Sequence, residues 1–491
     1  MAKRTAVIDL GSNSMRMAIY ERTSRWGFFI LSEYKMKVRL GEGGYGNGGE
    51  ISEQSMQKAF AAFSEFKSIA KSYKCMKIFC VGTSALRDAP NSNELIAMVR
   101  NKLGISIKVI NGQDEATYGA IAANRLLPAL NDAITLDIGG GSSELAFIKD
   151  SKIVGAVSLD IGTVRLKELF SDKKDKASLD EFLSKIISKI PANFRCENII
   201  AIGGSLRALS TAIMSKISYP ISTIHGFRYE LKEHENFITS LIAANNDELE
   251  GFAIKKDRFD TIREGATIFL NIAKALGCKN IYTSGVGVRE GVFLADFLRK
   301  SGKGELCERV GKFPEGLNVS IKSLQDRFAI TDNKSVCKYA RGIYDALAEL
   351  HGFEGAYLNE LVSAARIYNI GADIGFYSDH INSAYLVLNA LNFGFTHEQK
   401  ALIASIIATN GKKNVYEYDK YKTLLPKQDT VRWLSFMLSL ARMLNLNCAD
   451  LKLEFSFNNN TLFINGAKCL QMAKEEIKKL AKPEIFAISF N

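Results

Sequence analysis

Thr135-Leu-Asp-Ile-Gly-Gly-Gly-Ser-Ser-Glu144, followed by the apolar run 145–148, predicts a buried strand, a tight glycine turn and a second strand. Three successive glycines remove every Cβ at the turn, so several backbone N–H groups can approach one anion. Asp137 precedes the turn and Glu144 follows it, and both would repel a bound phosphate unless a cation lay between them. The stretch therefore indicates either a site for phosphate and Mg²⁺ or an ordinary β-hairpin with a glycine turn.

A partial copy of this pattern lies near the N-terminus. Asp9-Leu-Gly11 follows an apolar strand and precedes small polar residues, as Asp137-Ile-Gly139 does. Such a match predicts an internal repeat, in which each half of the molecule carries one hairpin. Two lobes of this kind, facing each other, would hold a phosphate from both sides of a cleft.

Helices and strands alternate between the two hairpins, which predicts an α/β lobe. The expected elements are a helix at 52–73, a strand at 78–81, a helix at 93–103, a strand at 105–110 and a helix at 116–127. Arg87 follows one strand end, where it could bind phosphate bidentately or form a surface ion pair with Asp88. Asp114 and Glu115 follow another, where acidic residues also commonly serve as helix caps.

The character of the chain changes near residue 306. Residues 133–298 repeat the plan of strands, glycine turns and helices, whereas helical patterns dominate the remainder. A hairpin is predicted at 451–464 from its alternating residues and its asparagine turn. We therefore expect three domains, at 1–126, 127–306 and 307–491.

The composition is that of an ordinary soluble globular chain, with 491 residues, 47% of them hydrophobic and 24% charged. Its net charge of +11 favours a polyanionic partner or reflects a solvated basic face. No helix-turn-helix, zinc or stacking motif supports specific nucleic-acid binding. The eight cysteines form no C-x-x-C pair, which favours a reducing cytoplasm over a zinc site or a disulfide framework. We expect no signal peptide and no membrane span.

Six motifs, in order along the chain, resemble the exopolyphosphatase / guanosine pentaphosphate phosphohydrolase family (Ppx/GppA) of the actin–Hsp70–sugar kinase superfamily. The motifs are Ala6-Val-Ile-Asp-Leu-Gly-Ser-Asn-Ser14, Val81-Gly-Thr-Ser-Ala-Leu-Arg87, Asn111-Gly-Gln-Asp-Glu-Ala116, Leu136-Asp-Ile-Gly-Gly-Gly-Ser142 with Glu144, Ala201-Ile-Gly-Gly-Ser205 and Ser284-Gly-Val-Gly-Val-Arg-Glu-Gly291. The resemblance implies an α/β fold with two actin-like, ribonuclease-H-like lobes around a cleft and a mainly helical, HD-like C-terminal domain. It also implies hydrolysis of a terminal phosphoanhydride bond.

The resemblance assigns roles to particular residues. It implies that Glu115 activates the attacking water, and that Asp137 and Glu144 lie near Mg²⁺ or another divalent cation. Asp9 and Asp137 lie on the two predicted hairpins, which would hold the metal and phosphate from both sides. A weaker match places Arg258 in contact with substrate. The positions that match phosphate contacts are Asn13, Ser14, Arg87, Gly139, Gly140, Gly141 and Ser142.

The C-terminal domain departs from the HD pattern, because the order here is Asp379-His380 and the His-Asp pair of a working metal site is missing. We therefore expect this domain to be catalytically silent and His380 to be structural rather than a ligand. The basic segments at 412–413 and 420–427 would either extend a path for a polyanion or form a solvated face. The resemblance alone suggests a homodimer through this domain.

Hydrolysis of a terminal phosphoanhydride bond is compatible with two substrates. The first is inorganic polyphosphate, which the net positive charge favours, and the alternative is the 5′ γ-phosphate of guanosine pentaphosphate (pppGpp), removed to give ppGpp. The sequence does not separate them. A sugar kinase of this superfamily would need an aspartate base in place of Glu115, and a nonenzymatic phosphate sensor would have lost this base.

Overall fold

The computed structural model describes residues 3–43, 48–173, 175–298, 318–328, 332–467 and 470–491. The chain forms two compact units, Met1–Thr23 with Phe28–Leu317 and Ser24–Gly27 with Asn318–Asn491. The three-domain division stays a prediction, and its expected boundary near residue 306 lies outside the described residues.

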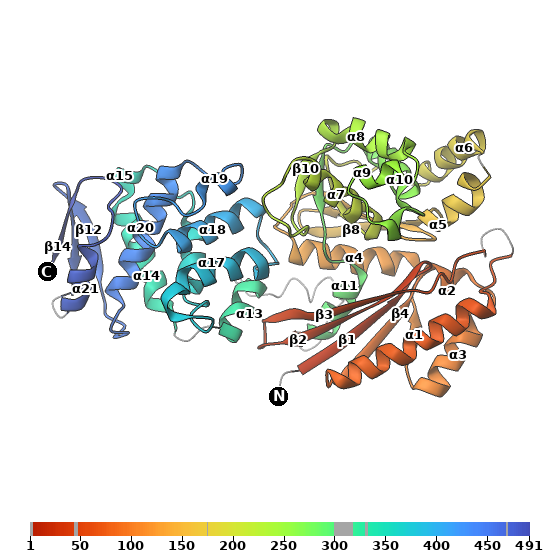
Figure 1. Ribbon diagram of the computed structural model, residues 1–491, viewed down its shortest axis with the longest axis horizontal. Coiled ribbons are helices and arrows are strands. Elements are labelled where there is room, and N and C mark those ends of the chain that lie inside the picture. Colours follow the sequence, from red (N-terminus) through yellow and green to blue (C-terminus); the bar gives the residue numbers. More distant parts are fainter. Residues whose placement is uncertain (1–2, 44–47, 174, 299–317, 329–331, 468–469) are drawn as a thin grey trace. The chain divides into compact units, whose positions relative to one another are not determined.

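The first unit begins with a five-stranded sheet in the order β3-β2-β1-β4-β5. Its elements are β1 (Lys3–Leu10), β2 (Ser14–Arg22), β3 (Phe28–Lys37), α1 (Glu53–Ser72), β4 (Lys77–Gly82), α2 (Ser84–Asp88), α3 (Ser92–Leu103) and β5 (Ile107–Val109). Alternate residues of a strand point to opposite faces. α1 lies against one face of this sheet (Figure 1). On that face, Ile8 and Met17 form a core with Phe63 and Phe66 of α1. The opposite face therefore carries Asp9. We call this sheet with α1–α3 the first lobe.

A six-stranded sheet in the order β10-β11-β9-β6-β7-β8 organises the rest of this unit. Its antiparallel β8-β7-β6 and parallel β6-β9-β11 pairings repeat those of β3-β2-β1 and β1-β4-β5, so the predicted internal repeat is confirmed. We call this sheet with α5–α10 the second lobe. Its elements are β6 (Ala133–Ile138), β7 (Ser143–Lys149), β8 (Lys152–Leu159), α5 (Thr163–Leu166), η1 (Lys167–Ser171), α6 (Lys176–Ile187), β9 (Asn198–Ile202), α7 (Gly204–Lys216), β10 (Arg228–Glu230), α8 (Leu231–Ala243), α9 (Glu248–Gly251), η2 (Lys256–Arg258), α10 (Ile262–Leu276) and β11 (Asn280–Thr283).

Two helices cross between the lobes. α4 (Gly112–Leu126) follows the first sheet in sequence but packs on β6, β7 and β8, and α11 (Val288–Phe297) follows the second sheet but packs on β1 and β2 (Figure 1). The two helices also pack against each other so closely that a Cβ on Gly291 would lie 2.1 Å from the carbonyl oxygen of Tyr118. Each lobe therefore packs against a helix that follows the sheet of the other lobe in sequence.

The structure corrects the predicted start of the helix at 116–127. α4 begins at Gly112, because the Asn111 side chain caps it by accepting a hydrogen bond of 2.7 Å from the backbone N–H of Asp114. Asp114 and Glu115 consequently lie inside the first turn of the helix rather than before it. The helix itself therefore fixes the direction of the Glu115 side chain.

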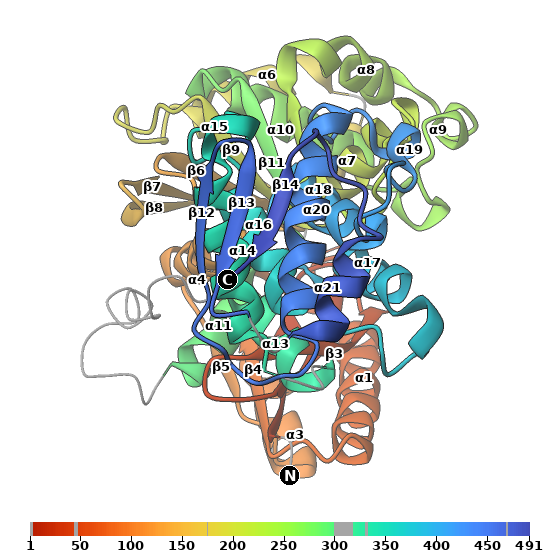
Figure 2. The same ribbon diagram turned by 90° about the vertical axis from the view of Figure 1, so that its left-hand side faces the viewer.

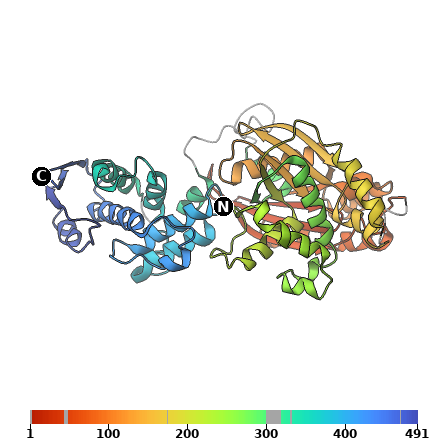
Figure 3. The same cartoon turned by 90° about the horizontal axis from the view of Figure 1, so that it is seen from above.

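The second unit is mainly helical, as predicted, and its helices surround an apolar core that includes Ile343, Ile403 and Leu434 (Figures 1 and 3). The predicted hairpin is formed by β12 and β13, and β14 adds a third, parallel strand beside β13 (Figure 2). The elements are α13 (Val319–Phe328), α14 (Lys334–Ala346), α15 (Ala348–His351), α16 (Leu358–Ile367), η3 (Phe376–Ser378), α17 (Asp379–Ala390), α18 (His397–Thr409), α19 (Tyr418–Tyr421), α20 (Gln428–Leu444), β12 (Glu454–Asn458), β13 (Thr461–Asn465), α21 (Gln471–Ile477) and β14 (Ala487–Phe490).

Two further features concern the described residues as a whole. None of their helices combines the length and the apolar character needed to cross a bilayer. The thiols of Cys75, Cys80, Cys196, Cys278, Cys337 and Cys448 are free. Cys307 and Cys469 lie outside the described residues.

Candidate active site

A polar cavity of about 130 Å³ lies between the two lobes of the first unit. Both glycine turns line it, together with the turn at 203–205, the first turn of α4 and the start of α11. The charged side chains on its wall are Asp9, Arg16, Glu115, Asp137, Glu144, Arg207, Arg258, Arg289 and Glu290. Carboxylates and guanidinium groups thus meet at the point where the two hairpins face each other.

The two hairpins close in the same way. Gly11 N–H donates to the Ser14 carbonyl at 3.2 Å in the first lobe, and Gly139 N–H donates to the Ser142 carbonyl at 2.9 Å in the second. A Cβ on Gly140 would lie only 3.0 Å from the Cβ of Ser12, so the turns meet across the cavity. Glycine at this position allows both turns to approach a single small ligand.

The glycine turn of the second lobe presents backbone donors in a fixed direction. The Gly139 carbonyl accepts a hydrogen bond from Thr163 N–H at 3.0 Å, and the Gly140 carbonyl accepts from Val164 N–H at 2.8 Å, both at the start of α5. A trans peptide points its N–H opposite to its carbonyl. The N–H groups of Gly140 and Gly141 therefore point away from α5, in a turn that lines the cavity, which suits an anion.

Asp137 and Glu144 face each other directly across this hairpin, in the register of β6 and β7. The pKa of Asp137 is raised to about 6, chiefly by burial and also by the neighbouring Asp9, although Arg207 and Arg16 lower it. Burial likewise raises the pKa of Glu144 to about 7, with a further contribution from Asp137, although Ser158 Oγ donates to Glu144 at 2.9 Å. The charge of Asp137 therefore disfavours the ionised form of Glu144.

That arrangement fits a divalent cation. Mg²⁺ prefers oxygen ligands and is commonly held by one or two carboxylates, with water and substrate phosphate completing its shell. Asp137 and Glu144 supply such a pair, and burial also raises the pKa of Asp9 on the facing hairpin. Among the residues that the structure describes, no three Asp, Glu, His or Cys side chains form a ligand cluster on their own. A pair completed by phosphate oxygens is consistent with this geometry.

Glu115 reaches the same cavity from the first turn of α4. Burial raises its pKa well above the ordinary value, and Glu144, Asp9 and Asp137 raise it further, whereas Arg87 lowers it. Glu115 is thus a carboxylate with a raised proton affinity. That is the property required of a general base.

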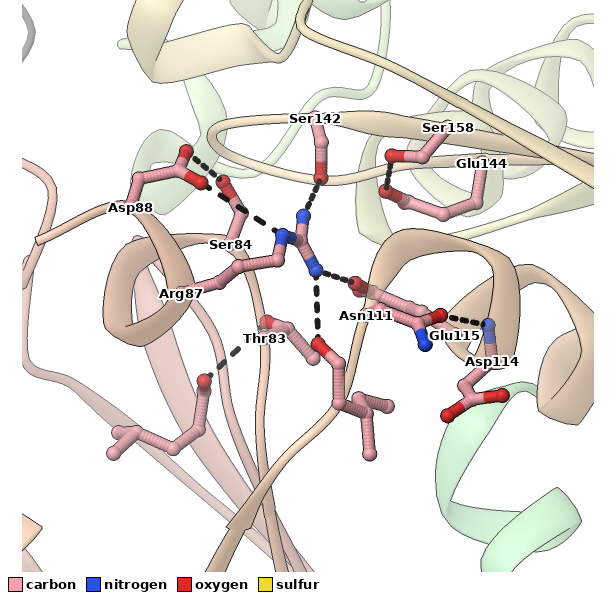
Figure 4. Close-up of polar contacts among 12 residues, drawn as sticks. Thr83, Ser84, Arg87, Asp88, Asn111, Asp114, Glu115, Ser142, Glu144 and Ser158 are labelled. Atoms are coloured by element: carbon pink, nitrogen blue, oxygen red, sulfur yellow. Dashed lines mark hydrogen bonds and ion pairs between the residues drawn. The ribbon is translucent and has the colours of Figure 1, made fainter.

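Arg87 lies between Glu115 and the glycine turn (Figure 4). Its Nη1 donates to Glu115 Oε2 at 3.2 Å and to the Ile110 carbonyl at 3.1 Å, and its Nη2 donates to Ser142 Oγ at 3.5 Å. Its distance to Asp88 is longer, at 3.7 Å, and Asp88 also pairs with Arg165 at 2.8 Å. Arg87 therefore does not simply form a surface ion pair with Asp88, because it also contacts Glu115 and Ser142.

Apart from Arg258, the arginines that line the cavity were not predicted from the sequence. Arg16 faces Asp9 across the first hairpin, where the second hairpin places Glu144 opposite Asp137. The pKa of Arg16 is lowered to about 10, chiefly by burial and also by Arg207, Arg289 and Arg258. The register of the hairpin was a signal that could have located Arg16, because residues opposite each other share a face of the sheet.

Arg258, predicted to contact substrate, does lie on the cavity wall. Its guanidinium packs on the glycine turn at 203–205, so that a Cβ on Gly204 would be 2.6 Å from Arg258 Nη2. Arg207 is fixed in place by a hydrogen bond from its Nε to the Ser284 carbonyl, at 2.8 Å.

The two hairpins of the repeat differ in charge. The second carries two acidic residues opposite each other, Asp137 and Glu144, whereas the first carries an acidic and a basic residue, Asp9 and Arg16.

Arg289 and Glu290, at the start of α11, are buried charged residues for which the sequence analysis gave no role. Tyr20 Oη of β2 donates to Glu290 Oε1 at 2.5 Å, and Gly287 N–H donates to Glu290 Oε2 at 2.7 Å. Arg289 Nη2 lies 3.0 Å from Glu33 Oε1 of β3. The motif at 284–291 was quoted above without a role for these residues, and its Arg-Glu pair at a helix start was the available signal.

The comparisons with known proteins agree with this geometry. The Ppx/GppA phosphatase family matches residues 18–300, and its domain III matches residues 318–476. The chain belongs to the Ppx/GppA phosphatase family. It is accordingly a phosphatase, with two actin-like lobes and a helical C-terminal domain.

Solved structures support the same fold. A crystal structure of the Aquifex aeolicus member of the Ppx/GppA family is 25% identical, with a TM-score of 0.53, and the match covers 62% of this chain and 100% of that one. A crystal structure of an exopolyphosphatase from Cytophaga hutchinsonii is 23% identical, with a TM-score of 0.56, and the match covers 60% of this chain and 98% of that one. The second likeness concerns the fold alone.

Most of the predicted site residues lie together on the cavity wall. These are Asp9, Asn13, Ser14, Glu115, Asp137, Gly139, Gly140, Gly141, Ser142, Glu144 and Arg258. Arg87 stands beside them through its contacts with Glu115 and Ser142. Their individual roles stay predictions.

Proposed function

We propose that this phosphatase releases orthophosphate from the end of inorganic polyphosphate, by attack of a water that Glu115 activates. The observation that carries the proposal is the position of Glu115. This buried carboxylate lies on the same cavity wall as the glycine turn, and Arg87 contacts both of them. A base and an anion cradle at one point are the two parts that hydrolysis of a phosphoanhydride requires.

The chemistry follows from the groups on the wall. The terminal phosphoryl group lies in the turn at 139–142, where the N–H groups of Gly140 and Gly141 stabilise charge on its oxygens. Glu115 accepts a proton as the water oxygen bonds to phosphorus. The bond from phosphorus to the bridging oxygen breaks, and that oxygen leaves with the electron pair as the new end of the shortened chain. Positioning and charge stabilisation account for most of the acceleration in such reactions.

Asp137 and Glu144 would hold Mg²⁺ or another divalent cation beside the phosphate, with Asp9 facing them from the first hairpin. The metal would neutralise negative charge on the phosphate oxygens. Burial raises the pKa of both Asp137 and Glu144 although nearby arginines lower it, so a bound cation would further stabilise their ionised forms. Arg16, Arg207 and Arg258 would neutralise phosphate oxygens from the opposite wall.

The net charge of the chain, +11, favours inorganic polyphosphate over guanosine pentaphosphate, because a longer polyanion gains more from a basic protein. Within the cavity, Arg16, Arg207, Arg258 and Arg289 supply cations for phosphate oxygens beside the carboxylates. The test is to measure kcat/KM for orthophosphate release from long-chain polyphosphate and from guanosine pentaphosphate under the same conditions with Mg²⁺. We expect the larger value for polyphosphate. A larger value for guanosine pentaphosphate would assign the enzyme to the nucleotide instead.

A further inference from the structure

A row of charged side chains runs from the cavity to the edge of the first sheet. Asp9 of β1 pairs in register with Arg16 of β2, and Arg16 pairs in register with Lys35 of the edge strand β3. Residues opposite one another on neighbouring strands share a face, with Cβ atoms about 5 Å apart. Lys37, two residues further along β3, lies on the same face. The cationic wall of the cavity therefore continues outward along this edge.

Like charges directly opposite each other in a sheet are destabilising. Arg16 and Lys35 form such a pair. Burial lowers the pKa of Lys35, and Arg258 and then Arg16 lower it further, although a hydrogen bond to Asp257 raises it. The folded protein therefore holds cations close together at a cost, which an anionic ligand would relieve.

Two aspartates that flank Arg258 in sequence now occupy this edge. Lys35 Nζ lies 3.0 Å from Asp257 Oδ2, and Lys37 Nζ donates to the Asp257 carbonyl at 2.8 Å. Asp260 Oδ2 lies 3.7 Å from Lys37 Nζ and 3.6 Å from Arg39 Nη2. These contacts join the first lobe to the second at the rim of the cavity.

The contacts have the character of exchangeable ion pairs. The side chains of Lys35 and Asp257 are 33% and 47% exposed, and pairs of this kind contribute only about 0–1 kcal/mol. Asp260 is held poorly, because its Oδ1 is buried without a hydrogen-bond partner among the described residues. An internal phosphoryl unit carries one negative charge, as a carboxylate does, but a long polyphosphate presents many such units while its end is held in the cavity, so its tail can replace these aspartates on lysine and arginine.

We propose that Lys35, Lys37 and Arg39 form a second phosphate-binding site, which takes the phosphoryl units that follow those held in the cavity. Asp257 and Asp260 occupy this site as internal counterions until a long substrate displaces them. The inference rests on the proposed function, because it concerns the tail of the same substrate. The rest of the polyphosphate chain would then run from the cavity outward along β3.

Three double variants test the proposal. Lys35→Met/Lys37→Met removes two of the three cations of the site, and Asp257→Asn/Asp260→Asn removes the competing anions. Lys67→Met/Lys71→Met removes two lysines from the exposed face of α1 as a matched control. For each, kcat and KM for orthophosphate release are measured with tripolyphosphate and with long-chain polyphosphate.

We expect the first variant to lower kcat/KM for long-chain polyphosphate about tenfold, equivalent to about 1.4 kcal/mol, and to change that for tripolyphosphate less than twofold. The aspartate variant should raise kcat/KM for the long chain about threefold through a lower KM, and the control should match the wild type. A purely structural bridge between the lobes predicts instead that the lysine and aspartate variants both lose activity on both substrates.

The outcomes separate this inference from the proposed function. If the wild type hydrolyses polyphosphate but the ratio of long-chain to tripolyphosphate kcat/KM is the same in all variants, only the second site is wrong. Loss of activity in the aspartate variant also overturns the second site, in favour of a structural bridge. If the wild type releases no orthophosphate from either polyphosphate, the proposed function is wrong and the second site falls with it.

Discussion

Arg87 Nη1 lies 3.2 Å from Glu115 Oε2, while the other terminal nitrogen of the same guanidinium lies 3.5 Å from Ser142 Oγ. One cation therefore contacts both the candidate base and the candidate phosphate cradle. Arg87 lowers the pKa of Glu115, whereas burial and three neighbouring carboxylates raise it. Arg87 is thus the group that opposes the rise in the pKa of Glu115 and favours its ionised form.

Replacing Arg87 should move the pH dependence of the reaction. Arg87→Gln removes the charge that favours ionised Glu115, so the pKa of Glu115 rises and the base stays protonated to higher pH. We expect the acidic limb of the profile of kcat/KM against pH to shift to higher pH, while Arg87→Lys, which keeps the charge, shifts it less. Arg165→Gln, which alters the neighbouring pair with Asp88, is the control. If the acidic limb does not move in Arg87→Gln, Arg87 does not influence the ionisation of Glu115.

Glu144 should make the metal-free protein less stable as the pH rises. Burial raises its pKa from 4.5 to about 7, so the folded state binds the proton more tightly than the unfolded chain. The free energy of unfolding therefore falls between pH 4.5 and pH 7, by on the order of 3 kcal/mol for this group. In EDTA, Glu144→Gln should show a smaller fall in Tm from pH 5 to pH 8 than the wild type. Glu65→Gln, on the exposed face of α1, should behave as the wild type does; equal falls in all three proteins would contradict the prediction.

Mg²⁺ should stabilise the protein most where these carboxylates are ionised. A ligand that binds only the folded state raises Tm, and protons compete with the metal for the same oxygens. We expect the rise in Tm on adding Mg²⁺ to be larger at pH 8 than at pH 5, and to be much smaller in Asp137→Asn at both values. The control is Asp180→Asn, on the exposed surface of α6. A full response in Asp137→Asn would place the cation elsewhere.

The close contact between the crossing helices can be tested at Gly291. A Cβ there would lie 2.1 Å from the Tyr118 carbonyl oxygen, so Gly291→Ala must displace α11 from α4, the helix that carries Glu115. We expect a loss of about 1–3 kcal/mol in the free energy of unfolding, and lower kcat. Gly119→Ala, in the same α4, places its Cβ at an ordinary 3.6 Å from Ile202 and should instead stabilise the protein by about 0.5–1 kcal/mol. Equal stability of both variants, measured by urea unfolding, would be inconsistent with the crossing.

The hairpins could be predicted from the sequence because their signals are local. Alternating apolar residues and a glycine turn specify a strand pair without reference to the rest of the chain, and both pairs formed where expected. β10 was missed because three residues carry no periodic signal, and β14 because its pairing with β13 depends on distant residues. The start of α4 was placed too late because the cap at Asn111 was not recognised.

The site was only partly predictable for a related reason. Carboxylates and glycines in short motifs were found, whereas Arg207 of α7 and Arg289 of α11 lie on elements that only the folded chain brings together. Arg16 could have been located from the sequence, because pairing the hairpin residues from the turn outward places it opposite Asp9. Crossing helices cannot be inferred from periodicity, because an amphipathic helix does not specify which sheet it covers.

The most direct test is orthophosphate release from long-chain polyphosphate in the presence of Mg²⁺, compared between the wild type and Glu115→Gln. Glutamine keeps the shape of the side chain but cannot accept the proton from water. We expect the wild type to turn over and the variant to lose about 10²–10⁴-fold in kcat, with equilibrium binding of polyphosphate changed less than about threefold. A variant that releases orthophosphate at nearly the wild-type rate would contradict the assignment of Glu115 as the base.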